Sequence, residues 1–306
     1  MLGIHELQVF VAAAETENFS AAARKLQLSQ PAISFQIQSL EQQLNVQLFQ
    51  RTGRRISLTE AGRDLLPMAR EMLNYSTRIE ETMCARQGIV KGSVQIGCST
   101  GPGKYVLPHL IGAFRKRYPD VQFSVHVMDR RSVEDRLLSQ QIHIGVVGLH
   151  TKNSDLECWP LFMDHLVLIV APTHCWADRP KIPLAQLQDA QWIFREEGAA
   201  SRQLVEASLA ESGIDSRSFN VAMELASPEA VETAVEAGHG VSFVSQLAVR
   251  HALELGRIIA VDVEGLTVQR QIYLARNRHR TCTCAQLRFR EFVESDDGQA
   301  LLAQLV

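Results

Sequence analysis

Apolar residues recur every three to four positions near the N-terminus, and this spacing predicts three packed helices. The first helix carries Leu7, Phe10, Val11 and Ala14. Residues 20–48 then indicate two short helices joined by a tight turn, with Ser20 expected as the N-cap of the first of them. Pro31 is tolerated only near a helix start, because it lacks the N–H that a deeper position must donate. The helix that begins near Pro31 has an apolar stripe made of Ile33, Ile37, Leu40 and Leu44.

The opposite face of this second helix is polar but uncharged. It holds Pro31, Ser34, Phe35, Gln38 and Gln42. An ordinary solvated face carries Lys and Glu, whereas these side chains are suited to contact base edges in a DNA groove. The segment therefore predicts a helix-turn-helix that places one helix in the major groove. Polar-faced helical hairpins in all-α proteins that bind no nucleic acid are the alternative.

A basic hairpin follows the helical segment. Residues 48–51 lead into a turn at Thr52 and Gly53, and residues 54–58 then alternate like a short strand. Such a wing can hold backbone phosphate, and its arginines are Arg51, Arg54 and Arg55. Residues 1–60 carry five Lys or Arg and five Asp or Glu, so only the wing is locally basic. One copy should therefore bind DNA weakly, and several copies or a second site are required for useful affinity.

A long amphipathic helix is predicted over residues 59–88, with Thr59 as its N-cap. Its apolar positions are Leu65, Ala69, Met72, Ile79 and Met83, with Leu66 and Leu73 alongside. Roughly 28 residues make a rod of about 42 Å, too long and isolated to bury its stripe alone. Pro67 should kink or interrupt it. Dimerisation through this helix is the simplest way to cover the stripe.

From Ser93 onward, strands alternate with helices, which is typical of an α/β sheet. The predicted strands are 93–98, 121–127, 142–148, 166–172, 192–194, 219–223, 240–244 and one around 268–275. The predicted helices are 102–118, 132–140, 201–212, 227–237 and one from Thr281. Because the last strand and helix return to the first set, the chain crosses twice between two groups of strands. Two crossings imply two lobes around a cleft with a hinge.

Polar residues gather at four helix starts that follow strands. A helix N-terminus has free N–H groups and favours negative charge, so such ends bind anions at the carboxyl edge of an α/β sheet. Ser132 and Asp135 resemble a capping box, and these hydroxyls can alternatively serve only as caps. Glu196 and Glu197 add negative charge, so a zwitterionic or hydroxyl-rich ligand is an alternative to a small carboxylate, sulfate-like or phosphorylated one. The candidate ligand-binding residues are Ser99, Thr100, Gly101, Arg131, Ser132, Gly148, Arg195, Glu196, Ser201, Ser227 and Pro228.

Charge, hydropathy and cysteine spacing narrow the classes of protein that remain possible. The net charge is −3, so bulk charge does not indicate nonspecific nucleic-acid binding. No apolar run approaches the roughly 18 residues of a membrane span and no cationic leader precedes the first helix, so we expect a cytoplasmic protein. The six cysteines form no CxxC pair, which favours reduced thiols over disulfides or a metal site. A redox role for Cys98 stays open.

An enzyme on the same two lobes would need a nucleophile, an acid/base pair or a cofactor motif. The sequence has no GxSxG, Walker or HExxH motif and no GxGxxG placed after a strand. We therefore expect no catalytic residue and no cofactor. An architectural DNA-binding protein without a ligand is the second alternative, but it leaves the two lobes unexplained.

The order of these motifs resembles the LysR-type transcriptional regulators along the whole chain. The resemblance rests on FSAAARKLQLSQPAIS at 19–34, followed by LFQRTGRRISLTEAG at 48–62. It implies an α plus α/β fold in three parts. These are a winged helix-turn-helix at 1–58, a linker helix that pairs two subunits at 59–88, and a two-lobed, periplasmic-binding-protein-like effector domain at 89–306. Lobe I is expected at about 93–165 and 266–306, and lobe II at about 166–265.

The same resemblance implies a sequence-specific DNA-binding regulator controlled by a small, anionic metabolite between the lobes. The implied partners are promoter DNA, RNA polymerase, the small-molecule effector and further copies of the chain in a homodimer or homotetramer, with no membrane. Ser99 and Thr100 match positions where family members place ligand-contacting hydroxyls. Residues 100–104 resemble members linked to sulfur assimilation and carbon fixation, although Gly101 and Lys104 depart from them.

The resemblance places one set of residues on DNA. Phe35 departs from it, because family members often carry a basic or polar residue there. We interpret Phe35 as a contact with a thymine methyl group or a sugar; burial against the wing or a neighbouring protomer is the alternative. The expected DNA-binding residues are Ser29, Gln30, Pro31, Ser34, Phe35, Gln38, Arg51, Thr52, Arg54 and Arg55.

Overall fold

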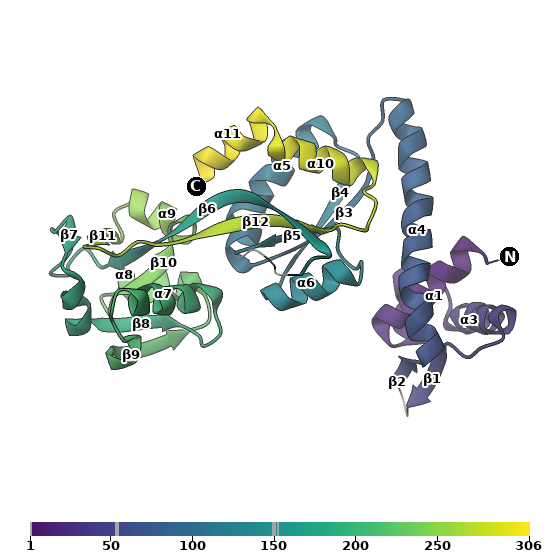
Figure 1. Cartoon of the computed structure of the whole chain (residues 1–306), viewed down its shortest axis with the longest axis horizontal. Coiled ribbons are helices and arrows are strands. Elements are labelled where there is room, and N and C mark those ends of the chain that lie inside the picture. The colour runs from purple at the N-terminus through teal and green to yellow at the C-terminus, as the bar shows by residue number, and fades with distance from the viewer. Residues whose placement is uncertain (1, 53–54, 149–150, 152) are drawn as a thin grey trace.

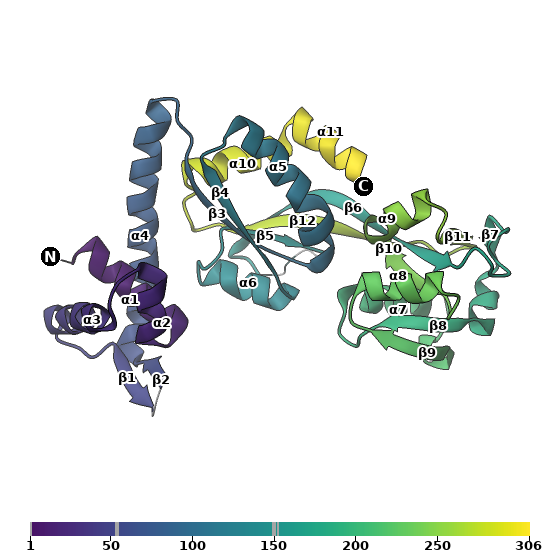
Figure 2. The ribbon, with the colours of Figure 1, turned by 180° about the vertical axis from the view of Figure 1, so that it is seen from behind.

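The computed structural model describes residues 2–52, 55–148, 151 and 153–306 (Figure 1). A small helical domain lies at one end, and the long helix α4 rises from it; the chain then enters the nearer of two α/β lobes, and the other lobe lies at the opposite end. The view from behind shows the same succession, with the two lobes side by side and joined by long strands (Figure 2).

The N-terminal domain consists of three helices and a two-stranded wing. Its elements are α1 (Ile4–Thr16), α2 (Phe19–Leu26), α3 (Gln30–Leu44), β1 (Phe49–Thr52) and β2 (Arg55–Leu58). The two strands pair antiparallel. The predicted apolar stripe is confirmed, because Ile33, Ile37 and Leu40 are buried against α1 and Leu44 is partly buried there.

The caps of the two short helices differ from the prediction at one position. Asn18, not Ser20, caps α2, and its side chain accepts hydrogen bonds from the backbone N–H groups of Ser20 and Ala21. Asn18 has the extended backbone that an N-cap needs, whereas Ser20 already lies inside the helix. Ser29 caps α3, which places Pro31 in the first turn, where its missing N–H costs nothing.

Helix α4 (Glu60–Arg86) is continuous over 27 residues, and Thr59 caps it by accepting from the N–H of Gly62. It continues through Pro67, so the predicted interruption is wrong. On both sides of the proline, α4 packs against the core of the N-terminal domain through Leu65 and Ala69. This packing offsets the hydrogen bond that Pro67 cannot donate.

Lobe I is built on parallel strands, as the sequence predicts. Strand β3 (Gly92–Cys98) pairs parallel with β4 (Val121–Val127) and β5 (Ile144–Val147). The connecting helices are α5 (Leu107–Arg117), which a short π-helical turn at Pro102–Val106 precedes, and α6 (Arg130–Leu138). The C-terminal helices α10 (Cys284–Glu294) and α11 (Asp296–Leu305) pack on the same core.

Two long strands run through both lobes. Strands β6 (Leu156–Val170) and β12 (Val268–Asn277) pair antiparallel along most of their length, and β12 lies between β5 and β6 (Figure 1). The sequence predicts this first crossing only from residue 166, and the strand begins ten residues earlier. The first part of this strand is not predicted, because neither Pro160 nor Asp164 is typical of a strand interior.

Lobe II has a smaller sheet and several elements that periodicity does not predict. The predicted elements are β8 (Gln191–Arg195), β9 (Asn220–Leu225), β10 (Ser242–Ser245), α7 (Ala200–Glu211) and α8 (Pro228–Glu236). The additional elements are β7 (Lys181–Ile182), α9 (Gln246–Glu254), β11 (Ile259–Val263) and, in lobe I, α11. Trp192 stacks on Phe219 with ring centroids 4.7 Å apart, and both rings belong to the hydrophobic core of lobe II. Within the described ranges, none of the helices has the length and apolarity to cross a membrane.

Candidate DNA-binding surface and effector site

Helix α3 presents its predicted polar face to solvent. Gln30, Pro31 and Gln38 are exposed, Ser34 is half-buried, and the cap Ser29 is exposed in front of them. Gln30 Nε2 donates a hydrogen bond to Ser34 Oγ over 3.0 Å, so the two side chains hold each other in place. The face is therefore free within the protomer and partly preorganised.

Phe35 lies on the same face with 69% of its surface exposed. Burial against the wing of its own protomer is thus excluded. A contact with DNA or with a neighbouring protomer accounts for so large an apolar side chain in water.

The wing is fixed to the end of α3. Glu41 Oε1 accepts hydrogen bonds from the backbone N–H groups of Leu48 and Phe49, at 2.7 and 3.1 Å. Arg51 and Thr52 lie in β1 and Arg55 lies in β2. Arg54, also expected to contact phosphate, lies outside the described residues.

The apolar residues of helix α4 lie on two faces, one packed in the protein and one exposed. Leu65, Leu66, Ala69 and Leu73 pack against the core of the same protomer, so the predicted single stripe is wrong for these four. The others face solvent and form what we call the exposed stripe: Met68, Met72, Tyr75, Ile79 and Met83. These five residues are between 42% and 62% exposed.

The first candidate ligand residues follow β3 directly. Ser99 Oγ is buried, and it forms no hydrogen bond with a described group. Thr100 and Gly101 begin the next helical segment, and the space where a Gly101 side chain would lie is open to 4 Å among the described residues. Cys98 lies beneath them, and burial raises its pKa to about 11. The thiolate that redox chemistry requires is therefore disfavoured at Cys98.

Helix α6 begins one residue before Arg131, and its cap differs from the prediction. Asp129 is the N-cap: Oδ1 accepts from the backbone N–H of Ser132 at 2.9 Å, and Oδ2 accepts from its hydroxyl at 2.6 Å. These bonds lower the pKa of Asp129. The predicted capping box of Ser132 and Asp135 is wrong, because Ser132 is already inside the helix. Arg131 is exposed.

On the lobe II side, Glu196 is paired, whereas Glu197 is exposed. Arg195 holds Glu196 through two contacts of 2.8 Å, and this hydrogen bonding lowers the pKa of Glu196. Ser227 caps α8 by accepting from the N–H of Ala230, and Pro228 is buried behind it. Ser201 lies in the first turn of α7 and does not cap it.

A contact between the lobes joins the π-helical turn before α5 to the start of α8. Lys104 Nζ and the hydroxyl of Tyr105 both donate to Glu229 Oε1, each over 2.7 Å. Burial raises the pKa of Glu229, but these two hydrogen bonds outweigh it and the pKa falls to about 2. In the sequence, Lys104 stands out only as a departure from the family, and nothing indicates a role for Tyr105 or Glu229.

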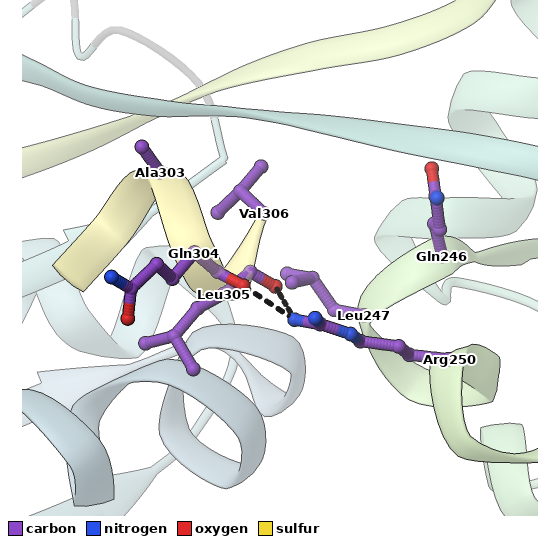
Figure 3. A pocket seen from close by; sticks show the side chains of 7 residues that line it. All are labelled: Gln246, Leu247, Arg250, Ala303, Gln304, Leu305 and Val306. Carbon is purple, nitrogen blue, oxygen red and sulfur yellow. Dashed lines mark hydrogen bonds between the residues drawn. The ribbon is translucent and has the colours of Figure 1, made fainter. Parts of the chain in front are cut away.

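Arg250 of α9 joins the lobes at a second place. It donates to the carbonyls of Gln304 and Leu305, at 2.6 and 3.4 Å, beside a cavity of about 230 Å³ (Figure 3). The cavity is lined by Gln246, Leu247, Arg250 and residues 303–306. None of the candidate ligand residues lines it.

A buried ion pair lies where the two long strands meet β10. Asp164 Oδ2 lies 2.8 Å from Arg270 Nη2, and Asp164 Oδ1 accepts from the Ser245 hydroxyl at 2.6 Å. Gly148 faces this pair, because an added Cβ would lie 3.2 Å from Arg270 Cδ. Gly148 is thus placed by packing against Arg270. Sequence periodicity did not identify Asp164, Arg270 or Ser245.

All six cysteines are free thiols. Within the described part of the chain, no group of three or more His, Cys, Asp or Glu residues is arranged to hold a metal ion.

Comparison with known proteins agrees with this architecture. The family model "Bacterial regulatory helix-turn-helix protein, lysR family" matches residues 4–63, and "LysR substrate binding domain" matches residues 87–297. The RuBisCO operon transcriptional regulator of Allochromatium vinosum is 33% identical over 296 residues, which cover 96% of each chain.

Two solved structures are similar as well. Full-length CbnR in complex with its target DNA is 26% identical with a TM-score of 0.62, covering 96% of this chain and 99% of CbnR. The regulatory domain of CcmR from Synechocystis PCC6803, in complex with 2-PG, is 25% identical with a TM-score of 0.59; the match covers 66% of this chain and 96% of that domain.

The polar face of α3, the wing and the two-lobed domain thus match in order and extent the parts of one family. The chain belongs to the LysR-type transcriptional regulators, which bind DNA through an N-terminal helix-turn-helix under the control of a small-molecule effector.

Proposed function

We propose that the effector of this regulator is a small phosphorylated or carboxylated metabolite, and that it binds between the two lobes. The observation that carries the proposal is the buried Ser99 hydroxyl at a helix start, which no described group satisfies. Leaving a buried hydroxyl unpaired costs about 1–3 kcal/mol, so a ligand oxygen at this position would recover that free energy.

The charges around this position favour an anion. Thr100 and Gly101 offer backbone N–H groups at the same helix start, where negative charge is stabilised. Lys104 already holds one carboxylate, that of Glu229. Glu196 is paired with Arg195, so its charge does not oppose an anionic ligand as strongly as the sequence suggests.

The relatives narrow the chemical class and the target genes. CcmR is solved with 2-PG, which is 2-phosphoglycolate, an anionic metabolite, and the Allochromatium relative is named for the RuBisCO operon. We infer that this chain regulates genes of carbon fixation rather than sulfur assimilation. Candidate effector contacts are Ser99, Thr100, Gly101, Arg131, Ser132, Gly148, Arg195, Glu196, Ser201, Ser227 and Pro228.

On DNA, we infer contacts from Ser29, Gln30, Pro31, Ser34, Phe35, Gln38, Arg51, Thr52, Arg54 and Arg55. Two α4 helices would pair through the exposed stripe, and pairs of dimers would set four recognition helices along a promoter. Effector binding would then change the spacing of these helices, the bend of the DNA and the recruitment of RNA polymerase. This role needs no catalytic residue and no cofactor, and it is exercised in the cytoplasm.

Thermal unfolding of the full-length protein with 2-phosphoglycolate tests the effector site. At ligand concentrations about 100-fold above Kd, the melting temperature of the wild type should rise on the order of 5 °C. Thr100→Val should abolish this rise while DNA binding is retained. Thr173→Val, an exposed threonine in lobe II, is the matched control and should respond like the wild type.

Ser99→Ala separates ligand binding from stability. Because it removes an unsatisfied hydroxyl, the ligand-free variant should be at least as stable as the wild type but should lose the ligand-induced rise. A wild type that does not respond to 2-phosphoglycolate, or a Thr100→Val variant that responds normally, would contradict the proposed site and ligand.

A further inference from the structure

A network of charged contacts connects lobe I to the helix-turn-helix within one protomer, and Arg70 of α4 is at its centre. Arg70 Nη1 donates to the carbonyl of Ser139 in lobe I over 2.7 Å. Its other terminal nitrogen, Nη2, lies 3.1 Å from Glu15 Oε1 in α1. Glu15 Oε2 in turn lies 2.8 Å from Lys25 Nζ in α2, the first helix of the helix-turn-helix. Three elements of two domains thus meet at one guanidinium.

The lobe I end of this network is the C-terminal end of α6. Ser139 is the C-cap of α6, and a cation at this end of a helix is favoured by the helix dipole. A second arginine, Arg280, donates to the carbonyls of Gln140 and Ile142 at 3.1 and 3.0 Å. The opposite end of α6 carries Arg131 and Ser132, which we assign to the effector site. One short helix therefore runs from the proposed ligand position to Arg70.

The end of strand β12 reaches the same place. Arg280 follows β12 and donates to Asn74 Oδ1 on α4 at 3.3 Å, and Asn74 Nδ2 donates back to the carbonyl of Thr281 at 3.3 Å. Since β12 runs through both lobes, a change in the angle between them would act on α4 at this contact as well as through α6.

Arg70 is buried, with 8% of its side chain exposed, whereas Glu15 is 28% exposed. Among the described residues, Glu15 supplies the sole carboxylate within ion-pair distance of Arg70. A buried cation that loses its counter-ion must regain water or move, because an uncompensated buried charge is strongly unfavourable. The bond between Arg70 and Ser139 therefore depends on Glu15, although the ion pairs of Glu15 with described residues are to Arg70 and Lys25 and not to lobe I.

We propose that Arg70 couples lobe I to the DNA-binding domain: it is the positioning residue through which a displacement of α6 reorients α1 and α2. The link to effector binding rests on the proposed function, because it assumes that the start of α6 borders the effector site. The coupling itself requires neither a particular effector nor DNA.

Hydrogen–deuterium exchange of the full-length protein, read by mass spectrometry without ligand or DNA, tests the coupling. Glu15→Gln should raise exchange over residues 136–142 of lobe I on the order of 5-fold. Glu17→Gln makes the same chemical change two residues away on an exposed side chain and should leave that segment unchanged. A purely local role of Glu15 in the helix-turn-helix would not alter exchange in lobe I.

A double-mutant cycle identifies Arg70 as the intermediary. Arg70→Gln should raise exchange over residues 136–142 by itself, and adding Glu15→Gln should then have little further effect. Arg70→Lys should behave like Arg70→Gln, because a lysine cannot bridge two acceptors in a fixed fork. The proposal is overturned if Glu15→Gln leaves the lobe I segment unchanged, or if the two substitutions act additively. Neither result bears on the identity of the effector, which the thermal unfolding experiment decides separately.

Discussion

Helices α3 and α4 pack their apolar residues into the same N-terminal core, yet their opposite faces differ in character. The free face of α3 carries hydroxyl and amide groups with a single large apolar side chain, Phe35. The free face of α4 is the exposed stripe, which consists of three methionines, a tyrosine and an isoleucine. For each helix, the side chains on the exposed face indicate the kind of partner, whereas the helical conformation itself does not. Polar groups suit the edges of bases, and apolar groups suit a second protein chain.

The two faces also differ in the free-energy cost of their exposure to water. A polar face is hydrated at little cost, whereas each large apolar side chain removed from water contributes on the order of 1.5–3 kcal/mol. We therefore expect the exposed stripe to be covered permanently by a second α4, and the α3 face to be free until DNA is bound.

The largest effect is expected from a charge in the exposed stripe. Ile79→Glu should raise the dissociation constant of the dimer on the order of 100-fold or more, because the carboxylate must be desolvated without a partner. Thr77→Glu adds the same charge on the opposite, exposed side of α4 and is the matched control. Sedimentation velocity over a range of concentrations measures both. Equal behaviour of the two variants would show that α4 does not pair through this stripe.

A smaller effect is expected on the α3 face. Ser34→Ala removes a hydroxyl and also frees Gln30, which Ser34 holds over 3.0 Å. Discrimination between the preferred site and a single-base mismatch should fall by about 10-fold, while binding to unrelated DNA is unchanged. Competitive gel shifts with a site selected from random sequence measure this ratio. Arg54→Ala should instead weaken binding to all sequences alike, so a similar pattern for the two variants would contradict the assignment.

The smallest effect is expected from Phe35. If it contacts a thymine methyl group, Phe35→Ala should weaken binding only a few-fold, roughly 1 kcal/mol. Replacing single thymidines in the site by deoxyuridine should weaken the wild type at one position and leave the variant unaffected there. A variant that binds every DNA equally well but dimerises more weakly would instead assign Phe35 to a protein interface, as for α4.

Sequence patterns predict the elements of the N-terminal domain well, because these elements are determined by residues that are close in sequence. The stripe of α3, the Pro31 helix start and the wing depend on neighbours within a few residues. The Asn18 cap could not be preferred over Ser20 from sequence, since both residue types cap helices and the choice depends on where the preceding turn ends. The division of the α4 apolar residues between a packed face and an exposed face depends on the tertiary position of the helix.

The sequence predicts the fold class of the effector domain but not the contacts between its residues. Lys104 and Glu229, Asp164 and Arg270, and Arg70 and Ser139 are each joined across many residues of sequence. Periodicity carries no information about such pairs. The short strands β7 and β11 were missed for a related reason, because two to five residues are too few to show a period.

The position of β12 between β5 and β6 affects how the protein is made. While the ribosome synthesises lobe II, the sheet of lobe I lacks an internal strand, and the edges of β5 and β6 that β12 later covers are unpaired. Unpaired edges in a nascent chain invite misassembly with other chains. Termination of translation before residue 268 should therefore leave the sheet of lobe I incomplete, although most of lobe I is synthesised first. We expect the nascent chain to need a chaperone until translation is nearly complete.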